Sequence, residues 1–275
     1  MKHFIKSVII LSLVFCFSSF KQQDEQAKKD KRIKVKMITT HGTMLLALYN
    51  ETPKHRDNFV KLVNEKKYDS LLFHRVINEF MIQGGDIDSK NAKKGEALGA
   101  GDLPYQVDAE FVPTLFHKKG ALAAARDGNA ARVSSSMQFY IVQGKVKNDS
   151  TLIVDEKRIN GWLAENYTLN MPENNEIKIA LDKAMEDEDY GNYQKLYKQI
   201  KDKAKTYTFD KYVIPQAHRE VYKTIGGTPF LDQNYTVFGE LLKGFEVLDK
   251  IAGVETNDMN RPHEDVRILS MRIVK

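Results

Sequence analysis

The segment at residues 73–86 constrains the fold more than any other part of the sequence. It reads FHRVINEFMIQGGD. This composition is too polar for a plain core strand and too apolar for a plain surface strand. A single arginine, Arg75, lies near its start, Met81 and Gln83 follow near its end, and a Gly-Gly-Asp turn closes it. We interpret this mixture of guanidinium, amide and apolar groups as one wall of a cleft.

The first twenty residues follow the order of a secretory signal peptide. Lys2 and Lys6 come first, an apolar run follows at 8–17, and a polar stretch comes after it at 21–32. The apolar run is too short to span a bilayer, which favours a cleaved signal at 1–20 over a transmembrane helix. The polar stretch is charged and lacks apolar periodicity, so we expect a tether there. An export signal predicts a protein of the bacterial envelope, either free in the periplasm or anchored to a membrane.

Cys16 is the only cysteine and lies at the end of the apolar run. Its position suits a lipoprotein signal, in which the thiol is acylated after cleavage, and we expect contact with a membrane only through such an anchor. Phe15 departs from the small residue that these signals prefer before the cysteine. Cleavage near Ser18 or Ser19 without lipidation therefore stays open as the alternative. In both cases the mature chain has no disulfide.

The composition argues against nucleic-acid binding. The 275 residues are 42% hydrophobic, which is enough for a substantial core. The formal net charge is +5, and it falls by two when Lys2 and Lys6 leave with the signal. The sequence has no basic stripe interleaved with aromatic residues, since most lysines alternate with acids. We therefore expect no nucleic-acid partner.

Two strands and a helix are expected at the start of the folded part. Apolar residues alternate with lysines at 33–37, a His-Gly pair follows at 41–42, and a second apolar run occupies 43–49. This pattern predicts a β-hairpin. Thr52 and Pro53 then have the pattern of an N-cap followed by proline in the first helical turn.

Residues 145–224 differ in character from the rest of the chain. Turn residues become rare, and apolar residues recur at helical spacing, which indicates helices. They are Leu181, Ala184, Met185, Tyr193, Leu196, Tyr197, Ile200 and Ala204. We interpret this region as an α-helical subdomain inserted between residues 33–144 and 225–275. A stripe of methionine and tyrosine at this spacing is more typical of packing than of a cofactor site.

Most catalytic motifs are absent from the sequence. It has no phosphate-binding Walker loop and no dinucleotide-binding glycine pattern. None of its seven histidines pairs with another at metal-ligand spacing, and a single cysteine excludes a thiolate zinc site. We therefore expect no cofactor and no metal. His74 is expected to be structural, with one ring nitrogen bonded to the backbone.

The remaining candidate residues form a group without a nucleophile. Four can donate hydrogen bonds and six supply apolar surface: Arg75, Gln83, Arg126 and Gln138, and then Phe80, Met81, Phe139, Tyr140, Phe230 and Leu231. Such a set suits a reaction that makes no covalent bond. Rotation about the peptide bond before a proline is such a reaction, because its barrier of about 18 to 20 kcal/mol comes from the planarity of the amide. Without a catalyst it takes roughly tens to hundreds of seconds.

Four segments of the chain resemble those of the cyclophilin peptidyl-prolyl isomerases. They lie at 73–86, 120–126, 136–142 and 230–239, in the order in which that family has them. Four matching segments are far more specific than one. The resemblance implies peptidyl-prolyl cis-trans isomerase activity on proline-containing polypeptide segments. Combined with the export signal, it implies a role in the folding of exported proteins.

The resemblance also implies the fold. A cyclophilin is mainly β, with a closed eight-stranded antiparallel barrel capped by two helices. Residues 33–144 and 225–275 would form this barrel, and residues 145–224 would be the helical insertion.

The family signature assigns roles to the matching residues. Arg75 would be catalytic, because a guanidinium aimed at the prolyl nitrogen binds the twisted amide better than either planar form. Gln83 would help to hold both the prolyl carbonyl and Arg75. The substrate-binding candidates are Phe80, Met81, Tyr140 and Leu231 as the proline pocket, Ala125, Arg126 and Gln138 along the substrate backbone, and Phe139, Phe230 and Tyr235.

Four of these positions depart from the residues that are usual in the family. Arg126 takes the place of the asparagine of eukaryotic members, although bacterial relatives also have arginine there. Tyr140 takes the place of a phenylalanine, Phe230 of a tryptophan and Tyr235 of a histidine. The hydroxyl of Tyr140 must therefore find water or a partner at the pocket floor.

The alternative function is that of a binding module. In this case the barrel holds proline-containing segments without isomerising them, and the helices at 145–224 recruit a protein partner or act as a chaperone arm. The presence of Arg75, Phe80, Met81 and Gln83 together favours the enzyme.

Overall fold

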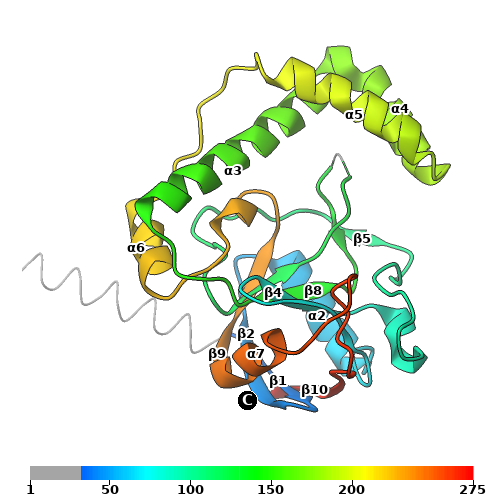
Figure 1. Ribbon diagram of the computed structural model, residues 1–275, viewed down its shortest axis with the longest axis vertical. Helices are drawn as coiled ribbons and strands as arrows, with labels where there is room; N and C mark the ends of the chain where they lie inside the picture. The colour runs from blue at the N-terminus through cyan, green and yellow to red at the C-terminus, as the bar shows by residue number, and fades with distance from the viewer. Residues whose placement is uncertain (1–31, 130, 275) are drawn as a thin grey trace, which may run out of the picture. The chain divides into compact units, whose positions relative to one another are not determined.

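Figure 1 shows the computed structural model, in which residues 32–129 and 131–274 are described. The predicted signal peptide at 1–20, the candidate lipidation site Cys16 and nearly all of the predicted tether at 21–32 lie outside these residues. Residues from Lys34 onward belong to one structural unit. Within the described ranges, no helix has the length and apolar character needed to cross a membrane.

The first two strands form the predicted hairpin. β1 (Lys34–Thr39) pairs antiparallel with β2 (Gly42–Leu48), and Met37 lies opposite Met44. Val35 and Met37 are fully buried whereas the lysine between them is exposed, so the alternation in the sequence corresponds to one buried face. This prediction is confirmed.

The first helix, α2 (Pro53–Asn64), begins at the predicted position. Proline occupies its first turn and Thr52 is its N-cap residue, but the Thr52 side chain makes no capping hydrogen bond. The helix buries Phe59, Leu62 and Val63. It packs against β9 (Val237–Lys243) and β10 (Ile268–Val274), whereas α7 (Phe245–Ala252) packs against β2, β3 (Phe73–Ile77) and β4 (Met81–Gly84).

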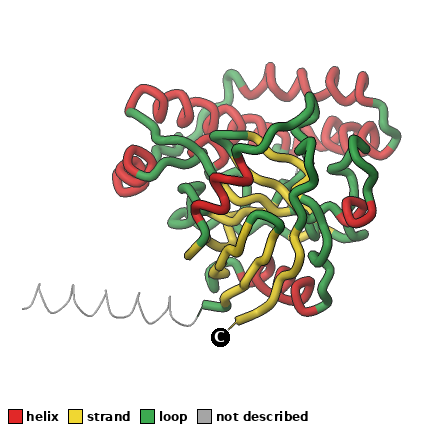
Figure 2. Tube along the Cα trace, turned by 60° about the horizontal axis from the view of Figure 1, so that its bottom comes forward, coloured by secondary structure: helices red, strands yellow, loops and turns green. Residues whose placement is uncertain are grey.

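Eight strands form one antiparallel sheet in the order β10, β1, β2, β9, β6, β8, β4, β3. The six strands outside the hairpin are β3 (Phe73–Ile77), β4 (Met81–Gly84), β6 (Ala121–Ala124), β8 (Phe139–Val142), β9 (Val237–Lys243) and β10 (Ile268–Val274). Two short strands, β5 (Gln106–Val107) and β7 (Ser134–Ser135), pair separately. Figure 2 shows the strands in yellow, with helices in red around them.

The large sheet is an open half-barrel, so the prediction of a closed barrel is wrong. Its end strands, β10 and β3, form no ladder with each other in the described residues, and a single bridge joins Leu72 to Arg267 where the two strands begin. The ladder does not continue because a loop occupies the edge of β3. The N–H of Val76 donates to the carbonyl of Asn260 at 2.8 Å, in the segment that precedes β10. That loop covers a sheet edge that would otherwise be exposed.

Four α-helices occupy the region predicted to be helical. They are α3 (Asp149–Leu169), α4 (Asn175–Glu186), α5 (Tyr190–Ala204) and α6 (Gln216–Thr224). A capping box between Asn148 and Thr151 begins α3. Most of the predicted stripe packs inside this region, where Leu169, Leu181 and Ile200 form a buried cluster, but Met185 is exposed. That these helices form a subdomain inserted into the β-sheet domain stays a prediction.

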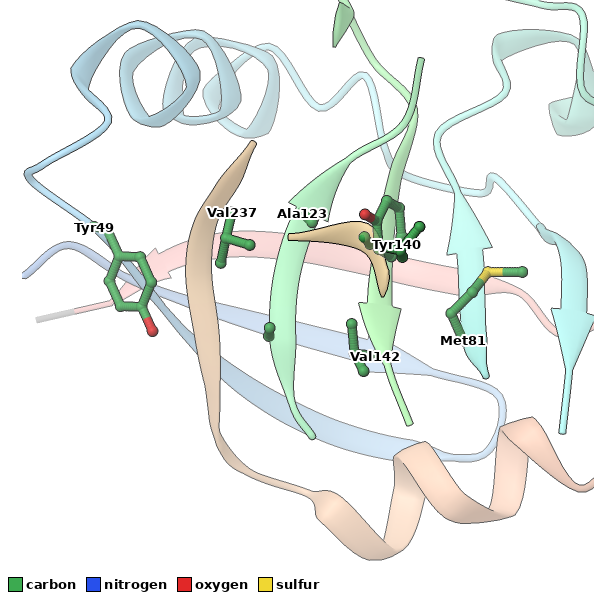
Figure 3. Close-up of a cluster of buried hydrophobic side chains, with 8 residues drawn as sticks. Tyr49, Met81, Ala123, Tyr140, Val142 and Val237 are labelled. Carbon is green, nitrogen blue, oxygen red and sulfur yellow. The ribbon is translucent and has the colours of Figure 1, made fainter. Parts of the chain in front are cut away.

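The two faces of the sheet bury different side chains. Phe139 on β8 packs edge-on against Phe59, Tyr68 and Phe73 on one face. Tyr140, the next residue, lies in a second cluster on the other face. Figure 3 labels six members of that cluster, Tyr49, Met81, Ala123, Tyr140, Val142 and Val237. Successive strand residues point to opposite faces. Phe139 therefore lies in the aromatic core, whereas Tyr140 lies at the candidate site.

Candidate active site

A chain of hydrogen bonds holds Arg75 on the β3–β4 hairpin. Arg75 and Gln83 lie opposite each other in the ladder, and the Arg75 Nη1 donates to Gln83 Oε1 at 3.2 Å. Gln83 Nε2 donates to Gln138 Oε1 at 3.0 Å. Gln138 Nε2 in turn donates to the carbonyls of Gly99 (2.9 Å) and Gly101 (3.1 Å). The guanidinium is thereby fixed through two amides to the backbone of a loop.

Arg75 borders a cavity of about 250 Å³, which we call the Arg75 cavity. Most of the predicted site residues line it: Arg75, Phe80, Met81, Gln83, Ala125, Arg126, Tyr140, Leu231 and Tyr235. Burial lowers the pKa of Arg75 from its ordinary value, yet an arginine remains charged in proteins. The cavity therefore combines apolar walls with the guanidinium groups of Arg75 and Arg126, of which that of Arg75 is partly desolvated.

A buried network holds Tyr140 at the floor of this cavity. The Tyr140 hydroxyl lies 2.9 Å from His117 Nε2, and His117 Nδ1 lies 2.8 Å from Asp232 Oδ1. The Tyr222 hydroxyl on α6 donates to Asp232 Oδ2 at 2.7 Å. The Asp232 carboxylate can only accept, so the Nδ1–H of His117 donates to it. Burial raises the pKa of Tyr140 and of Tyr222 well above the ordinary value, so both hydroxyls keep their protons.

This network supplies the partner that the sequence predicted for the Tyr140 hydroxyl. The sequence did not identify His117, Asp232 or Tyr222, because His117 lies 115 residues before Asp232 in the chain and no local pattern connects them. The one signal present was the tyrosine itself, since a buried phenol needs a hydrogen-bond partner.

Arg126 and Tyr235 form one side of the cavity. The Arg126 guanidinium lies over the Tyr235 ring at 4.7 Å from its centroid, and Tyr235 meets Tyr140 edge-on at 6.1 Å. Ala125 also lines the cavity, but its N–H donates to the carbonyl of Gln138 and its carbonyl accepts from Ser135. Of this predicted pair, Arg126 is therefore the better candidate to pair with a substrate backbone.

Three predicted site residues lie outside the lining of the Arg75 cavity. Gln138 lines a neighbouring cavity of about 730 Å³, which shares Gln83, Ala125 and Arg126 with it. Phe139 faces the aromatic core on the opposite side of the sheet. Phe230, in the short helix η3 (Pro229–Leu231), stacks on Phe80 with ring centroids 5.6 Å apart.

Comparison with known proteins identifies the family. The family model described as cyclophilin type peptidyl-prolyl cis-trans isomerase matches residues 34–169 and 164–273. The chain belongs to the cyclophilin-type peptidyl-prolyl cis-trans isomerases. The half-barrel sheet described above is therefore that of a cyclophilin, and the activity of the family is the isomerisation of bonds before proline.

Bacterial proteins named as peptidyl-prolyl cis-trans isomerases are similar to this chain along most of its length. A protein of Staphylococcus haemolyticus named as a peptidyl-prolyl cis-trans isomerase is 30% identical over 246 residues, which cover 89% of this chain and 93% of that protein. A Streptococcus pyogenes protein named as a bifunctional phosphatase and peptidyl-prolyl cis-trans isomerase is 31% identical. The match covers 87% of this cyclophilin but only 38% of that longer protein.

A solved structure agrees with the fold. The crystal structure of a cyclophilin type peptidyl-prolyl cis-trans isomerase from Cryptosporidium parvum matches with a TM-score of 0.52 at 19% identity. The match covers 89% of this chain and 98% of that one. At this identity it supports the cyclophilin fold alone.

No cluster of three or more histidine, cysteine, aspartate or glutamate residues that could hold a metal ion occurs in residues 32–129 and 131–274. The expectation that the protein needs no cofactor rests on the sequence.

Proposed function

We propose that this cyclophilin isomerises the bond before proline by using Arg75 to stabilise the twisted amide. The observation that carries the proposal is the fixed arrangement of Arg75 beside an apolar cavity, held through Gln83 and Gln138. Twisting the amide localises the lone pair on the prolyl nitrogen, so a positioned positive charge favours the twisted state over both planar states. Phe80, Met81, Tyr140 and Leu231 form a slot for a proline ring, which has no N–H to satisfy.

Substitution of Arg75 tests this mechanism. We expect Arg75→Ala to lower kcat/KM on a proline tetrapeptide by about 100-fold, the usual cost of removing a preorganised charge-stabilising donor. Arg75→Lys should recover part of the loss, since it keeps the charge but not the planar fork. The protease-coupled assay of cis-trans isomerisation gives the rates, and circular dichroism shows that the variants fold.

Arg272 gives a matched control for the loss of an arginine. It lies on β10 and pairs with Asp69 at 2.8 Å. Arg272→Ala should keep kcat/KM within about twofold of the wild type, since surface ion pairs contribute little. Equal rates for the wild type and Arg75→Ala would reject the enzymatic mechanism. If the wild type and Arg75→Ala had equal rates and both still bound proline peptides, this result would favour the binding module.

We also propose that the substrates are exported proteins in the bacterial envelope. The support is the sequence order at residues 1–20, with Lys2 and Lys6 followed by a short apolar run. Anchoring through Cys16 and release into the periplasm are the two alternatives. The helices at 149–224 are candidates for recruiting a protein partner in either location.

A further inference from the structure

A second cavity adjoins the Arg75 cavity on the side of the helices. It measures about 230 Å³ and is lined by Trp162, Glu165 and Tyr197 together with Arg126 and Tyr235. We call it the helix-side cleft. Arg126 and Tyr235 also line the Arg75 cavity, whose volume of about 250 Å³ is similar. The two cavities are therefore neighbours that share a wall, and each can hold a side chain of similar size.

Helix α3 is fixed against the substrate side of the β-sheet domain. The Trp162 ring meets Phe230 edge-on at 6.5 Å, and Phe230 stacks on Phe80 of the Arg75 cavity. The Arg158 guanidinium lies over Phe230 at 4.1 Å and over Trp162 at 4.7 Å. These contacts form an aromatic surface that continues from the proline slot onto the helix.

Helix α5 forms the other wall of the cleft. The Tyr197 hydroxyl donates to Glu165 Oε2 on α3 at 2.6 Å, and its ring stacks on Tyr193. The Tyr193 hydroxyl donates to the carbonyl of Gly128 at 3.2 Å, on the β-sheet domain. The cleft is thus held between two helices and the β-sheet domain by side-chain contacts on both sides, which makes it a preformed site.

The charges in the cleft are balanced, and its rings are apolar. Arg126 and Arg132 face Asp127 and Glu165, so the lining favours neither an anion nor a cation. Both arginines already donate to backbone carbonyls, those of Asn234 and Gln233 at 2.9 Å each. The aromatic rings and Leu169 of α3 remain as the surface that a ligand can cover.

We propose that the helix-side cleft binds an apolar or aromatic side chain of the same unfolded polypeptide segment whose proline lies in the Arg75 cavity. The inference rests on the proposed function, because continuity with the proline slot identifies the occupant. A segment running from one cavity to the other passes Arg126 and Tyr235. The cleft thereby extends the recognised length of substrate beyond the proline and selects segments with an apolar residue on one flank.

The experiment compares peptides of two lengths on the full chain. A proline tetrapeptide fills only the Arg75 cavity, whereas peptides extended by five residues at either end, each with one phenylalanine in the extension, can also reach the cleft. We expect one of the two extended peptides to bind about fivefold more tightly than the tetrapeptide. Replacing its phenylalanine with aspartate should remove the gain. Trp162 is the only tryptophan and lines the cleft, so its fluorescence reports binding directly.

A matched pair of substitutions on α5 locates the effect. Tyr197→Ser should raise the Kd and KM of the extended peptide about fivefold, with kcat unchanged and the tetrapeptide unaffected. Tyr190→Ser makes the same change on the same helix at an exposed position outside the cleft, and should leave all values unchanged.

The outcomes separate this inference from the proposed function. If neither extension improves binding, or if Tyr197→Ser binds the better peptide as the wild type does, the cleft is not a substrate site even though the tetrapeptide is isomerised. If no peptide is isomerised, the proposed function fails. The fluorescence titration then still decides whether the cleft binds the extended peptides. Should Tyr197→Ser not fold, the phenylalanine and aspartate peptides on the wild type decide the same question.

Discussion

His74 lies beside Arg75 on β3 and is buried, and neither of its ring nitrogens has a hydrogen-bond partner in the described residues. Burial is the main reason that its pKa is lowered to about 4. Arg75 and Arg261 add to the effect, and Asp86 opposes it. The ring is therefore neutral at physiological pH. Since a bond rotation needs no proton transfer, a neutral and unpartnered histidine here does not interfere with the reaction.

His74 should make the protein less stable in mild acid. In the unfolded chain the imidazole takes up a proton near pH 6.5, whereas the folded protein resists protonation down to about pH 4. Between these values the unfolded state binds more protons, so the free energy of unfolding falls as the pH decreases, and this loss is absent above about pH 6.5. At pH 5 we expect a loss of about 2 kcal/mol from this residue. Urea unfolding at pH 7 and pH 5 measures it.

The control for this prediction is His74→Phe. Burial also lowers the pKa of His55 and of His218, so both proteins will lose some stability in acid. The difference between the two pH dependences isolates His74. Identical dependences in the wild type and His74→Phe would show that the ring is protonated in the folded protein.

At the residue scale, the sequence named candidate side chains but did not predict what each of them contacts. His74 was expected to be structural with a backbone hydrogen bond, and the structure shows it buried without that bond. Phe139 was grouped with the substrate-binding residues, but the pleat turns it to the opposite face from Tyr140. Both differences arise because a side chain's partners depend on strand register and on residues distant in sequence.

Helix α6 is linked to the pocket floor through one hydroxyl. Tyr222 on α6 donates to Asp232 Oδ2 at 2.7 Å, and Asp232 Oδ1 accepts from His117, which holds Tyr140. All four side chains are buried. The helix thus contributes to the same hydrogen-bonded unit as the cavity.

Removing this hydroxyl should destabilise the protein. Tyr222→Phe keeps the ring but leaves a buried carboxylate oxygen without its donor, which costs about 1 to 3 kcal/mol. Chemical denaturation of the purified variant measures the change. Tyr190→Phe is the matched control, because Tyr190 is exposed on α5. Removing its hydroxyl should change the free energy of unfolding by less than about 0.5 kcal/mol. Similar stabilities for the two variants would mean that Tyr222 does not support the network.

At the element scale, local sequence patterns predicted individual strands and helices. They did not predict whether the strands form an open or a closed sheet. Alternation in β1 and β2 and the Thr-Pro pair before α2 were sufficient, because these signals act within a few residues. The open sheet was not predictable from them. Whether the sheet closes depends on which segment hydrogen-bonds to the outer edge of β3, the loop at Asn260 or another strand. These segments are far apart in the chain.

At the scale of the whole molecule, the helical region leaves and rejoins the β-sheet domain at one place. Lys145 and Gly227 form an isolated bridge, and the N–H of Lys147 donates to the carbonyl of Tyr222 at 3.0 Å. Neighbouring ends are compatible with the predicted insertion, because the flanking strands can then keep their pairing, and the insertion itself stays a prediction. The sequence predicted the helices from periodicity alone, but their contacts with Phe230 needed the structure.

The N-terminus carries the remaining prediction, export to the envelope. We expect a chain expressed with all its residues in a bacterial host to lose its N-terminal signal, since residues 1–20 have the order of charge, apolar run and small residues that signal peptidases recognise. Intact-mass spectrometry of protein from the envelope fraction distinguishes the routes. A new N-terminus at Cys16 with added acyl mass indicates a lipid anchor, whereas an unmodified end near Ser18 or Ser19 indicates release. Cys16→Ser should abolish the acylated form and leave the other unchanged. Full-length protein in the cytosol, still beginning at Met1, would contradict export and with it the proposed envelope substrates.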